Sequence, residues 1–189
     1  MSRYSALLDA NVLYPAPIRD LLLQLAVMDV YRAKWTADIH EEWINALLRR
    51  EPRRRRDDLE RTRALMDRSV RDAIVTDYAD LIPSLPLPDP DDRHVLAAAI
   101  VGRCDVIVTQ NLKDFPEDVL SRYGIEAQHP DAFLLNQKAL EPAKFCEAVA
   151  TVRARLRSPP YSVEEYLAIL TRQGLVATAV ELRQFSAFI

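Results

Sequence analysis

The sequence predicts an α/β fold built on a central parallel sheet, with a helical extension at its C-terminal end. Short apolar segments at residues 4–9 and 105–109 alternate with longer segments in which apolar residues recur at helical spacing. This alternation is typical of parallel sheets, whose strands are buried on both faces and therefore apolar at nearly every position. After about residue 137 the pattern is wholly helical. We therefore expect two parts, residues 1–137 around the sheet and residues 138–189 as the extension.

Four elements are expected in the first 50 residues. The strand at residues 4–9 ends at Asp9, and a leucine-rich helix follows at about residues 17–29. Residues 35–36 are a candidate second strand. A helix then begins at Asp38, the expected N-cap, because an apolar stripe follows it, formed by Ile39, Trp43, Ala46 and Leu47.

The middle of the chain returns to the sheet. Residues 49–71 are dense in charge and are expected to be partly helical, and residues 73–76 are a candidate strand. Four prolines mark a loop before an expected helix at about residues 90–101, which Gly102 can end. The β-branched segment at 105–109 is the clearest strand of the chain.

The extension is expected to hold several helices. Residues 158–160, a serine and two prolines, interrupt its first helical run. Ser162 and Glu165 have the spacing of a capping box, which indicates that a new helix begins there. Gly174 offers a stop, and a last helix is expected from about residue 175 to the end.

Composition excludes several classes of protein. With 49% apolar residues among 189, the chain can form one sizeable core, and its net charge of −3 argues against a domain that is basic all over. Three glycines cannot build a P-loop or a dinucleotide-binding loop. No apolar run is long enough to cross a membrane, and two cysteines fit a reduced protein, so we expect a cytoplasmic location.

Oxygen-bearing side chains follow both clear strands. Asp9 ends the first, and Asn111 and Asp114 come after the last. In an open parallel sheet, ligands bind beyond the carboxyl ends of the strands, which brings these residues to one edge. A single aspartate at a strand end is also common in turns, so Asp9 alone decides little.

Two further acidic segments flank helices. Asp89 is a natural N-cap before Pro90, and acids in a first helical turn complement the helix dipole. Asp92, however, begins a helix that is apolar almost all round, where a buried acid is costly unless it is paired or binds a metal. In the helix after residue 38, Glu42 borders the apolar stripe, whereas Glu41 points to solvent.

Four carboxylates, those of Asp9, Glu42, Asp92 and Asp114, therefore form a set that can converge. Clustered carboxylates repel one another and are tolerated mainly where divalent cations neutralise them. Oxygen ligands favour Mg²⁺ or Mn²⁺ over zinc. Such ions activate water and hold a phosphodiester for attack, so the set indicates phosphodiester hydrolysis.

Four motifs in order resemble those of PIN-domain ribonucleases, and in particular the VapC-type toxins of bacterial type II toxin–antitoxin pairs. They are residues 8–13 (LDANVL), Glu42-Trp43, residues 89–99 (DPDDRHVLAAA) and residues 108–116 (VTQNLKDFP), and the resemblance covers about residues 1–135. It implies a PIN-like three-layer α/β/α fold and an endoribonuclease that requires Mg²⁺ or Mn²⁺. The implied catalytic and metal-binding acids are Asp9, Glu42, Asp92 and Asp114.

The resemblance also bears on partners and on one departure from the family pattern. It implies an RNA substrate, a small antitoxin protein and a homodimer. Many members carry an acid where this chain has Asn111, so Asp114 must supply the charge here, as in the subgroup with an Asn-x-x-Asp-Phe pattern. Asp89 is an auxiliary acid or only a helix cap.

Residues 49–71 hold ten arginines against five acids. Either they form a solvated helix face with an exposed loop, or Arg53, Arg54, Arg55 and Arg56 contact the RNA backbone or an acidic antitoxin segment. The three histidines have no metal-ligand spacing, and His94 is expected to be a packing residue rather than a base. Trp35, Trp43 and both cysteines are expected in the core.

Three alternatives to a toxin ribonuclease stay open. The first is a PIN nuclease of RNA processing that has no antitoxin. The second is a catalytically silent PIN domain that binds RNA or protein, because Asn111 departs from the pattern. The third, a phosphoacceptor receiver domain, needs an acid pair after its first strand, and this strand carries only Asp9.

Overall fold

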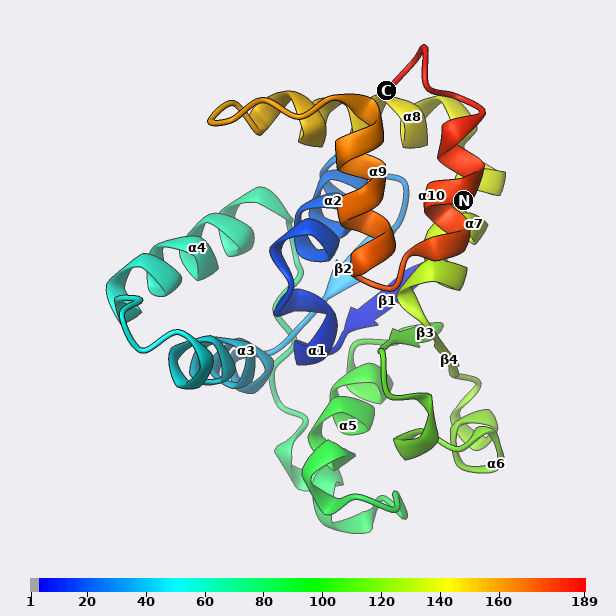
Figure 1. Ribbon diagram of the computed structural model, residues 1–189. Coiled ribbons are helices and arrows are strands. Elements are labelled where there is room, and N and C mark those ends of the chain that lie inside the picture. Colours follow the sequence, from blue (N-terminus) through cyan, green and yellow to red (C-terminus); the bar gives the residue numbers. More distant parts are fainter. Residues whose placement is uncertain (1–3) are drawn as a thin grey trace. The chain divides into compact units, whose positions relative to one another are not determined.

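A computed structural model describes residues 4–189 (Figure 1). The chain forms two compact units. The first comprises the N-terminal residues as far as Tyr14 together with Arg32–His129, and the second comprises Pro15–Tyr31 and Pro130–Ile189. The helical C-terminal region thus shares its unit with a helix from near the N-terminus.

The first unit contains a four-stranded sheet in which all neighbouring strands are parallel, in the order β2-β1-β3-β4. Leu8, the last residue of β1, pairs with Val108, the last residue of β3. Every residue of these two central strands is buried, which indicates that the sheet is covered on both faces. The predicted α/β/α fold around a parallel sheet is confirmed. The strands are β1 Ser5–Leu8, β2 Arg32–Lys34, β3 Val106–Val108 and β4 Glu126–Gln128.

Helices of the first unit flank this sheet. The buried helix α5 packs against β1 and β3 and ends at Gly102 as predicted, and α6 packs against β4. The helices are α1 Ala10–Leu13, α3 Ala37–Arg50, α4 Arg56–Ser69, α5 Arg93–Val101 and α6 Glu117–Leu120. Short 3₁₀ helices connect them: η1 Ala79–Ser84, η2 Pro90–Asp92, η3 Leu112–Asp114 and η4 Ser121–Tyr123.

A network of polar contacts joins α3 to α4. The indole nitrogen of Trp43 donates to Nδ1 of His40 at 2.9 Å, and Nε2 of His40 lies 3.0 Å from Oδ1 of Asp67. The indole of Trp35 donates to the same Asp67 oxygen at 2.9 Å. Since Nδ1 accepts, the proton of the neutral imidazole is on Nε2, and burial lowers the pKa of His40 accordingly. Both tryptophans are in the core, as predicted.

The structure corrects several expected elements of the first unit. The second strand is Arg32–Lys34, not residues 35–36, and the expected strand at 73–76 is reduced to one bridge between Trp35 and Ile74. The four-residue helix α1 and the strand β4 were not expected. Both edge strands are three residues long and carry polar residues, so their sequence lacks the apolar pattern of a buried strand.

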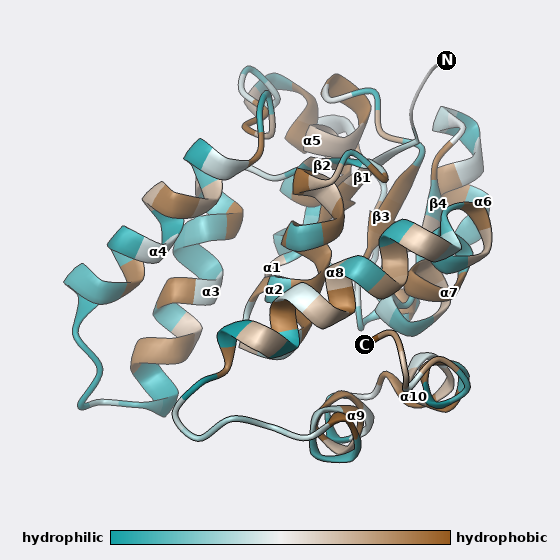
Figure 2. Ribbon diagram, turned by 90° about the horizontal axis from the view of Figure 1, so that it is seen from above, coloured by the Kyte–Doolittle hydropathy of each residue, from teal (hydrophilic) through white to brown (hydrophobic). Residues whose placement is uncertain are grey.

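The N-terminal cap of α3 also differs from the prediction. Thr36, not Asp38, is the N-cap, and its hydroxyl accepts from the amide of Ile39 at 3.0 Å. Asp38 instead lies in the first turn, where its carboxylate accepts from the hydroxyl of Tyr78 at 2.6 Å. Within α4, Leu59 and Met66 are buried. The ribbons of α3 and α4 alternate between hydrophilic and hydrophobic segments, as expected for helices with one buried side (Figure 2).

The second unit is helical throughout. In it α2 packs against α8 and α9, α7 packs against α8 and α10, and the rings of Tyr31 and Phe133 meet edge to face. The predicted capping box of Ser162 and Glu165 is present, whereas the last helix ends at Arg183, not at the C-terminus. Across residues 4–189, no helix is both long and apolar enough to cross a membrane. The helices are α2 Ala16–Val27, α7 Pro130–Leu140, α8 Pro142–Arg155, α9 Val163–Arg172 and α10 Val176–Arg183.

Candidate active site

Asp9 is held at the carboxyl end of β1 by residues of α1, of β3 and of the segment that follows β3. Its backbone amide donates to the carbonyl of Val108 at 3.1 Å, so it continues the sheet for one more residue. Its side-chain oxygen Oδ2 accepts from the hydroxyl of Thr109 at 2.7 Å and from the amide of Asn11 at 2.6 Å. Only 5% of Asp9 is exposed, and this burial raises the pKa of its carboxyl, although the Thr109 hydrogen bond opposes the rise.

The loop after β3 is tied to the same cluster. The hydroxyl oxygen of Thr109 accepts from the backbone amide of Asn111 at 3.0 Å, and the amide of Gln110 donates to Oδ1 of Asn11 at 2.9 Å. The side-chain amide of Asn111 donates to Oδ2 of Asp114. Asn111 therefore orients the carboxylate of Asp114.

Asp92 is the residue on which the acidic charges converge. It is the N-cap of α5, yet its carboxylate accepts no hydrogen bond from any residue within 4–189. Burial, followed by the negative charges of Asp9, Asp114, Asp89 and Glu42, raises the pKa of Asp92 to about 7. The ionised form of Asp92 is thus disfavoured both by burial and by the acids around it.

Asp89 has the capping geometry predicted for it. Its Oδ1 accepts from the backbone amide of Asp91 at 2.9 Å, which caps the 3₁₀ helix η2. Its charge still contributes to the raised pKa of Asp92. Capping of η2 and proximity to the acidic group are therefore both present.

The two neighbouring glutamates of α3 have different partners. Oε1 of Glu42 lies 2.7 Å from Nε2 of His94 on α5, whereas Glu41 pairs with Arg56 and, at 3.2 Å, with Arg63 on α4. The helix thus directs Glu42 toward the acidic group and Glu41 toward the arginine-rich segment.

His94 is mostly buried, as a packing residue is, and it makes one polar contact that was not predicted from the sequence, the one to Glu42. Its side chain is 12% exposed. Burial lowers the pKa of the imidazole, but the hydrogen bond to Glu42 and the charges of nearby acids raise it by more, so that the net change is an increase. The sequence offered one indication of this contact, because His94 lies two residues after Asp92, in the first turn of a buried helix.

The donor chemistry of the acidic group fits a hard cation. All four predicted ligands are carboxylates, and oxygen ligands are those that Mg²⁺ and Mn²⁺ prefer. Over the described part of the chain, no three histidine, cysteine, aspartate or glutamate side chains are arranged around a common metal position. Mg²⁺ commonly keeps several waters and takes only one or two protein carboxylates directly, so the donor set still suits it.

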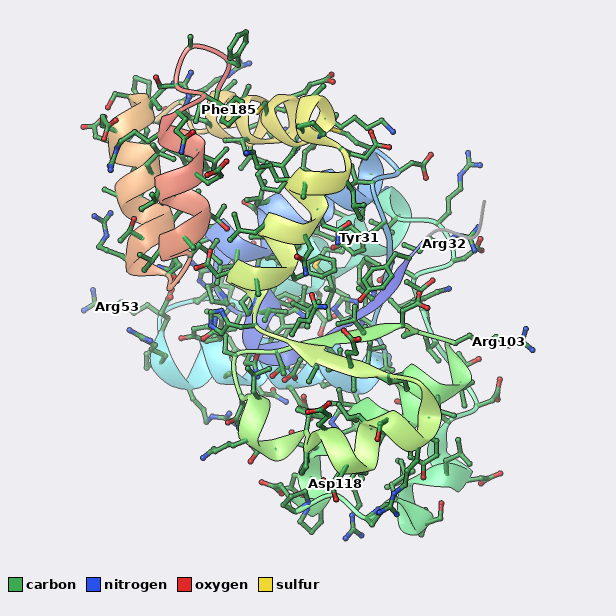
Figure 3. All side chains as sticks on the ribbon, turned by 90° about the vertical axis from the view of Figure 1, so that its right-hand side faces the viewer. Tyr31, Arg32, Arg53, Arg103, Asp118 and Phe185 are labelled. Atoms are coloured by element: carbon green, nitrogen blue, oxygen red, sulfur yellow. The ribbon has the colours of Figure 1, made fainter. Side chains whose placement is uncertain are left out.

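The four arginines proposed for nucleic-acid or partner contact lie before and at the start of α4, and all are exposed. Three of them pair with acids: Arg54 with Glu51 at 2.9 Å, Arg55 with Asp57 at 2.9 Å, and Arg56 with Glu41 and Glu60. Within the described residues, Arg53 has no ion pair, and its side chain extends away from the ribbon (Figure 3).

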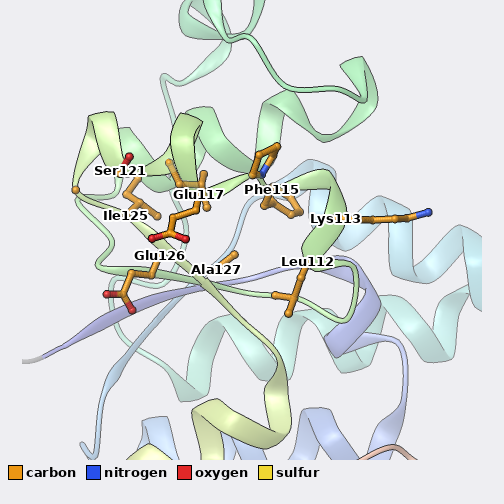
Figure 4. A pocket seen from close by; sticks show the side chains of 11 residues that line it. Leu112, Lys113, Phe115, Glu117, Ser121, Ile125, Glu126 and Ala127 are labelled. Atoms are coloured by element: carbon orange, nitrogen blue, oxygen red, sulfur yellow. The ribbon is translucent and has the colours of Figure 1, made fainter.

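A cavity of about 670 Å³ lies in the first unit beside the edge strand β4. Figure 4 shows Glu117 among the side chains that line it, with Glu126 and Leu112 at its borders. Phe115 and Leu120, both buried, contribute to its apolar lining. None of the predicted acids lines it, so the candidate site is not this cavity.

Comparison with known proteins agrees with the motifs. The PIN domain family matches residues 5–113, and the VapC50 C-terminal domain family matches residues 130–184. A curated protein of Mycobacterium tuberculosis (strain ATCC 25618 / H37Rv), named "Putative ribonuclease VapC50", is 45% identical over 97 residues. The match covers 51% of this chain and 56% of that protein, so the chain matches little more than half the length of this relative.

No solved structure matches the chain. The family assignment therefore depends on the two family matches, on the identity to the mycobacterial protein and on the parallel sheet described above. The PIN match alone spans more than half of the chain, and a VapC50 C-terminal domain follows it. The chain belongs to the PIN-domain family, as a member of the VapC type.

Proposed function

We propose that the protein is an endoribonuclease that hydrolyses RNA phosphodiester bonds with the aid of Mg²⁺ or Mn²⁺, and that it is the toxin of a toxin–antitoxin pair. The observation that carries the proposal is the convergence of acids from separate elements on Asp92, whose carboxylate has no donor in the described chain. A mycobacterial relative whose name includes ribonuclease supports the same reaction class.

In this proposal Asp9, Glu42, Asp92 and Asp114 hold the metal, and Asp89 and Asn111 assist. When bound, the metal supplies an activated water and balances negative charge on the phosphate. Thr109 and Asn11 fix one oxygen of Asp9, and Asn111 fixes one oxygen of Asp114. The Asp9 carboxylate also accepts from the backbone amide of Ala10. These contacts orient the carboxylates before a metal binds, which is the pre-organisation that a metal site requires.

The arginine segment is a candidate RNA-backbone contact within this proposal. The ion pairs of Arg54, Arg55 and Arg56 are solvent-exposed, and pairs of this kind contribute little to stability. Exchange of these partners for phosphate oxygens therefore costs little, and Arg53 requires no exchange. An acidic antitoxin segment would use the same chemistry. We further propose a homodimer and, because both cysteines are buried and free, a reduced cytoplasmic setting.

The test is RNA cleavage by the purified full chain in Mg²⁺, in Mn²⁺ and in EDTA. We expect cleavage only with metal, and we expect Asp9→Asn to abolish it, because that change removes a ligand charge while its amide keeps the shape. Asp91→Asn is the matched control, since Asp91 is an exposed neighbour of the group. Cleavage in EDTA, or full activity of Asp9→Asn, would contradict the proposal.

The uncharged Asn111 favours one second candidate, a silent PIN domain that binds RNA without cutting it. The two candidates differ in the same assay, because a silent domain retains RNA binding in EDTA and never yields product with metal. Coexpression with the product of a small adjacent reading frame separates a toxin from an RNA-processing nuclease: an antitoxin relieves growth arrest, whereas a processing nuclease has no such partner.

A further inference from the structure

We propose that His94 is a positioning residue that fixes the carboxylate of Glu42 for metal binding. The inference rests on the proposed function, because it assigns a role toward the metal-binding group. It adds a residue that is not itself one of the four acids, and that acts through its hydrogen bond to one of them.

The contact joins Glu42, a long and partly exposed side chain, to His94, which is mostly buried. Glu42 is 44% exposed on the surface of α3, and an exposed glutamate has several rotamers, whose restriction costs conformational entropy. His94 is 12% exposed in the first turn of α5, a helix whose next five residues are buried. The 2.7 Å contact therefore transfers the fixed position of α5 to the end of the Glu42 side chain.

One oxygen of Glu42 is used and the other is spared. Nε2 of His94 contacts Oε1, so Oε2 has the freedom to bind a cation. Two of the other acids are also held by uncharged polar partners, which donate to Oδ2 of Asp9 and to Oδ2 of Asp114. His94 completes this set on the side of Glu42.

Packing alone does not explain a histidine at this position. Its Nδ1 is buried and has no hydrogen-bond partner among residues 4–189, so the imidazole carries the cost of one unsatisfied polar atom. An apolar residue of similar size would avoid that cost. The single polar contact of the ring is the one to Glu42. That contact, rather than packing, therefore accounts for a histidine at this position.

The spacing of the residues supports the assignment. Asp92 caps α5 and His94 follows two residues later, so one short helix supplies both a predicted ligand and the group that orients another. Partners that orient metal-binding side chains typically account for 10–100-fold in metal affinity. Removal of the His94 hydrogen bond is therefore expected to weaken metal binding within that range.

The test uses Mn²⁺ as the probe and needs no RNA. Binding of Mn²⁺ to the full chain is measured from the electron paramagnetic resonance signal of the unbound ion, for wild type, His94→Gln, His94→Asn and His94→Leu. The Gln amide reaches the position of Nε2, whereas the shorter Asn amide does not. We expect His94→Asn and His94→Leu to weaken Mn²⁺ affinity roughly 10-fold, and His94→Gln to restore most of it.

A double-mutant cycle with Glu42→Gln separates positioning from a general structural effect. If His94 acts through Glu42, His94→Leu causes no further loss of Mn²⁺ affinity in the Glu42→Gln background. Additive losses, wild-type affinity of His94→Leu, or failure of His94→Gln to exceed His94→Asn would each overturn the inference. His94→Asn serves as the second variant should His94→Leu not fold, which urea unfolding reveals.

Failure of the two proposals is distinguishable in this experiment. Wild-type protein that binds Mn²⁺ and cleaves RNA, with His94 variants that bind the ion equally well, overturns the positioning role and leaves the ribonuclease intact. Wild-type protein that neither binds Mn²⁺ nor cleaves RNA overturns the proposed function, and the role of His94 with it.

Discussion

The hydroxyl of Thr109 donates to Oδ2 of Asp9 at 2.7 Å and joins residues that are 100 positions apart in the chain. The same oxygen of Thr109 accepts from the backbone amide of Asn111 and from the side chain of Asn11. One buried hydroxyl thus connects the ends of β1 and β3 and orders the loop that carries Asp114.

Replacing Thr109 by valine, which has the same shape, tests this connection. Thr109→Val leaves the amide of Asn111 and the Asp9 oxygen with one partner fewer, so we expect a loss of about 1–3 kcal/mol in the free energy of unfolding. Cleavage in Mg²⁺ should fall at least about 10-fold, since the hydrogen bond that orients a metal ligand is removed. Thr109→Ser keeps the hydroxyl and should retain activity. Equal activity of the valine and serine variants would contradict this account.

Neutralising Asp92 should separate stability from activity. Because burial and nearby acids raise the pKa of Asp92 to about 7, its ionised form destabilises the metal-free fold. We expect Asp92→Asn to unfold at a temperature a few degrees higher in EDTA, where about 1 kcal/mol corresponds to roughly 2–4 °C. The same variant should not cleave RNA, and Mg²⁺ should not raise its unfolding temperature as it raises that of wild type.

The direction of the pH dependence follows from the same shift. An aspartate has a pKa of about 3.9 when unfolded, below the folded value of about 7. Wild type in EDTA should therefore lose stability as pH rises from about 4 to 7, whereas Asp92→Asn should lose less. Asp91→Asn, which changes an exposed acid, should follow wild type. If stability falls with pH equally in wild type and in Asp92→Asn, the raised pKa of Asp92 does not explain the loss.

The Asp67 carboxylate should be the main polar support of α4. It accepts from Trp35 and contacts Nε2 of His40, so Asp67→Ala leaves two buried donors without a partner. We expect a loss of about 2–6 kcal/mol in the free energy of unfolding, at about 1–3 kcal/mol for each unsatisfied group. Urea denaturation measures it. Asp58→Ala, at an exposed position of the same helix, should cost less than about 0.5 kcal/mol, and similar losses in both variants would argue against the network.

Asp131 should control the stability of α10 within the second unit. Its two carboxylate oxygens accept from the backbone amides of Ala177 at 2.9 Å and Thr178 at 2.8 Å, which satisfies the start of that helix from outside. We expect Asp131→Ala to cost about 1–2 kcal/mol, and Asp131→Asn, which keeps one acceptor, to cost less. Hydrogen exchange should accelerate first in α10. Unchanged exchange there would show that this cap is dispensable.

The arginines at residues 53–56 should contribute to RNA affinity without sequence preference. Replacing all four with glutamine should weaken binding of a single-stranded RNA in EDTA and reduce the slope of log affinity against log salt by about 0.7 for each RNA phosphate that the protein no longer neutralises. Fluorescence anisotropy measures both quantities. Arg103→Gln, at another exposed arginine of the first unit, is the control (Figure 3). An unchanged salt slope would assign residues 53–56 to a protein partner or to solvent.

Features that depend on local pattern can be predicted from the amino-acid sequence alone. The buried strands β1 and β3, the long amphipathic helices and the capping box of Ser162 follow from apolar periodicity and capping chemistry, which act over a few residues. The four acidic motifs, in their order along the chain, were also sufficient to predict the family. These features need no knowledge of which segments meet.

The pairing of distant segments, by contrast, depends on three-dimensional packing. The edge strands β2 and β4 form because a neighbouring strand offers backbone partners. Their polar residues do not predict a strand. The choice of Thr36 over Asp38 as the cap, and the grouping of residues 15–31 with 130–189, depend on the path of the backbone. The contact of His94 with Glu42 joins two helices 52 residues apart, and such pairing follows from packing, which no local pattern encodes.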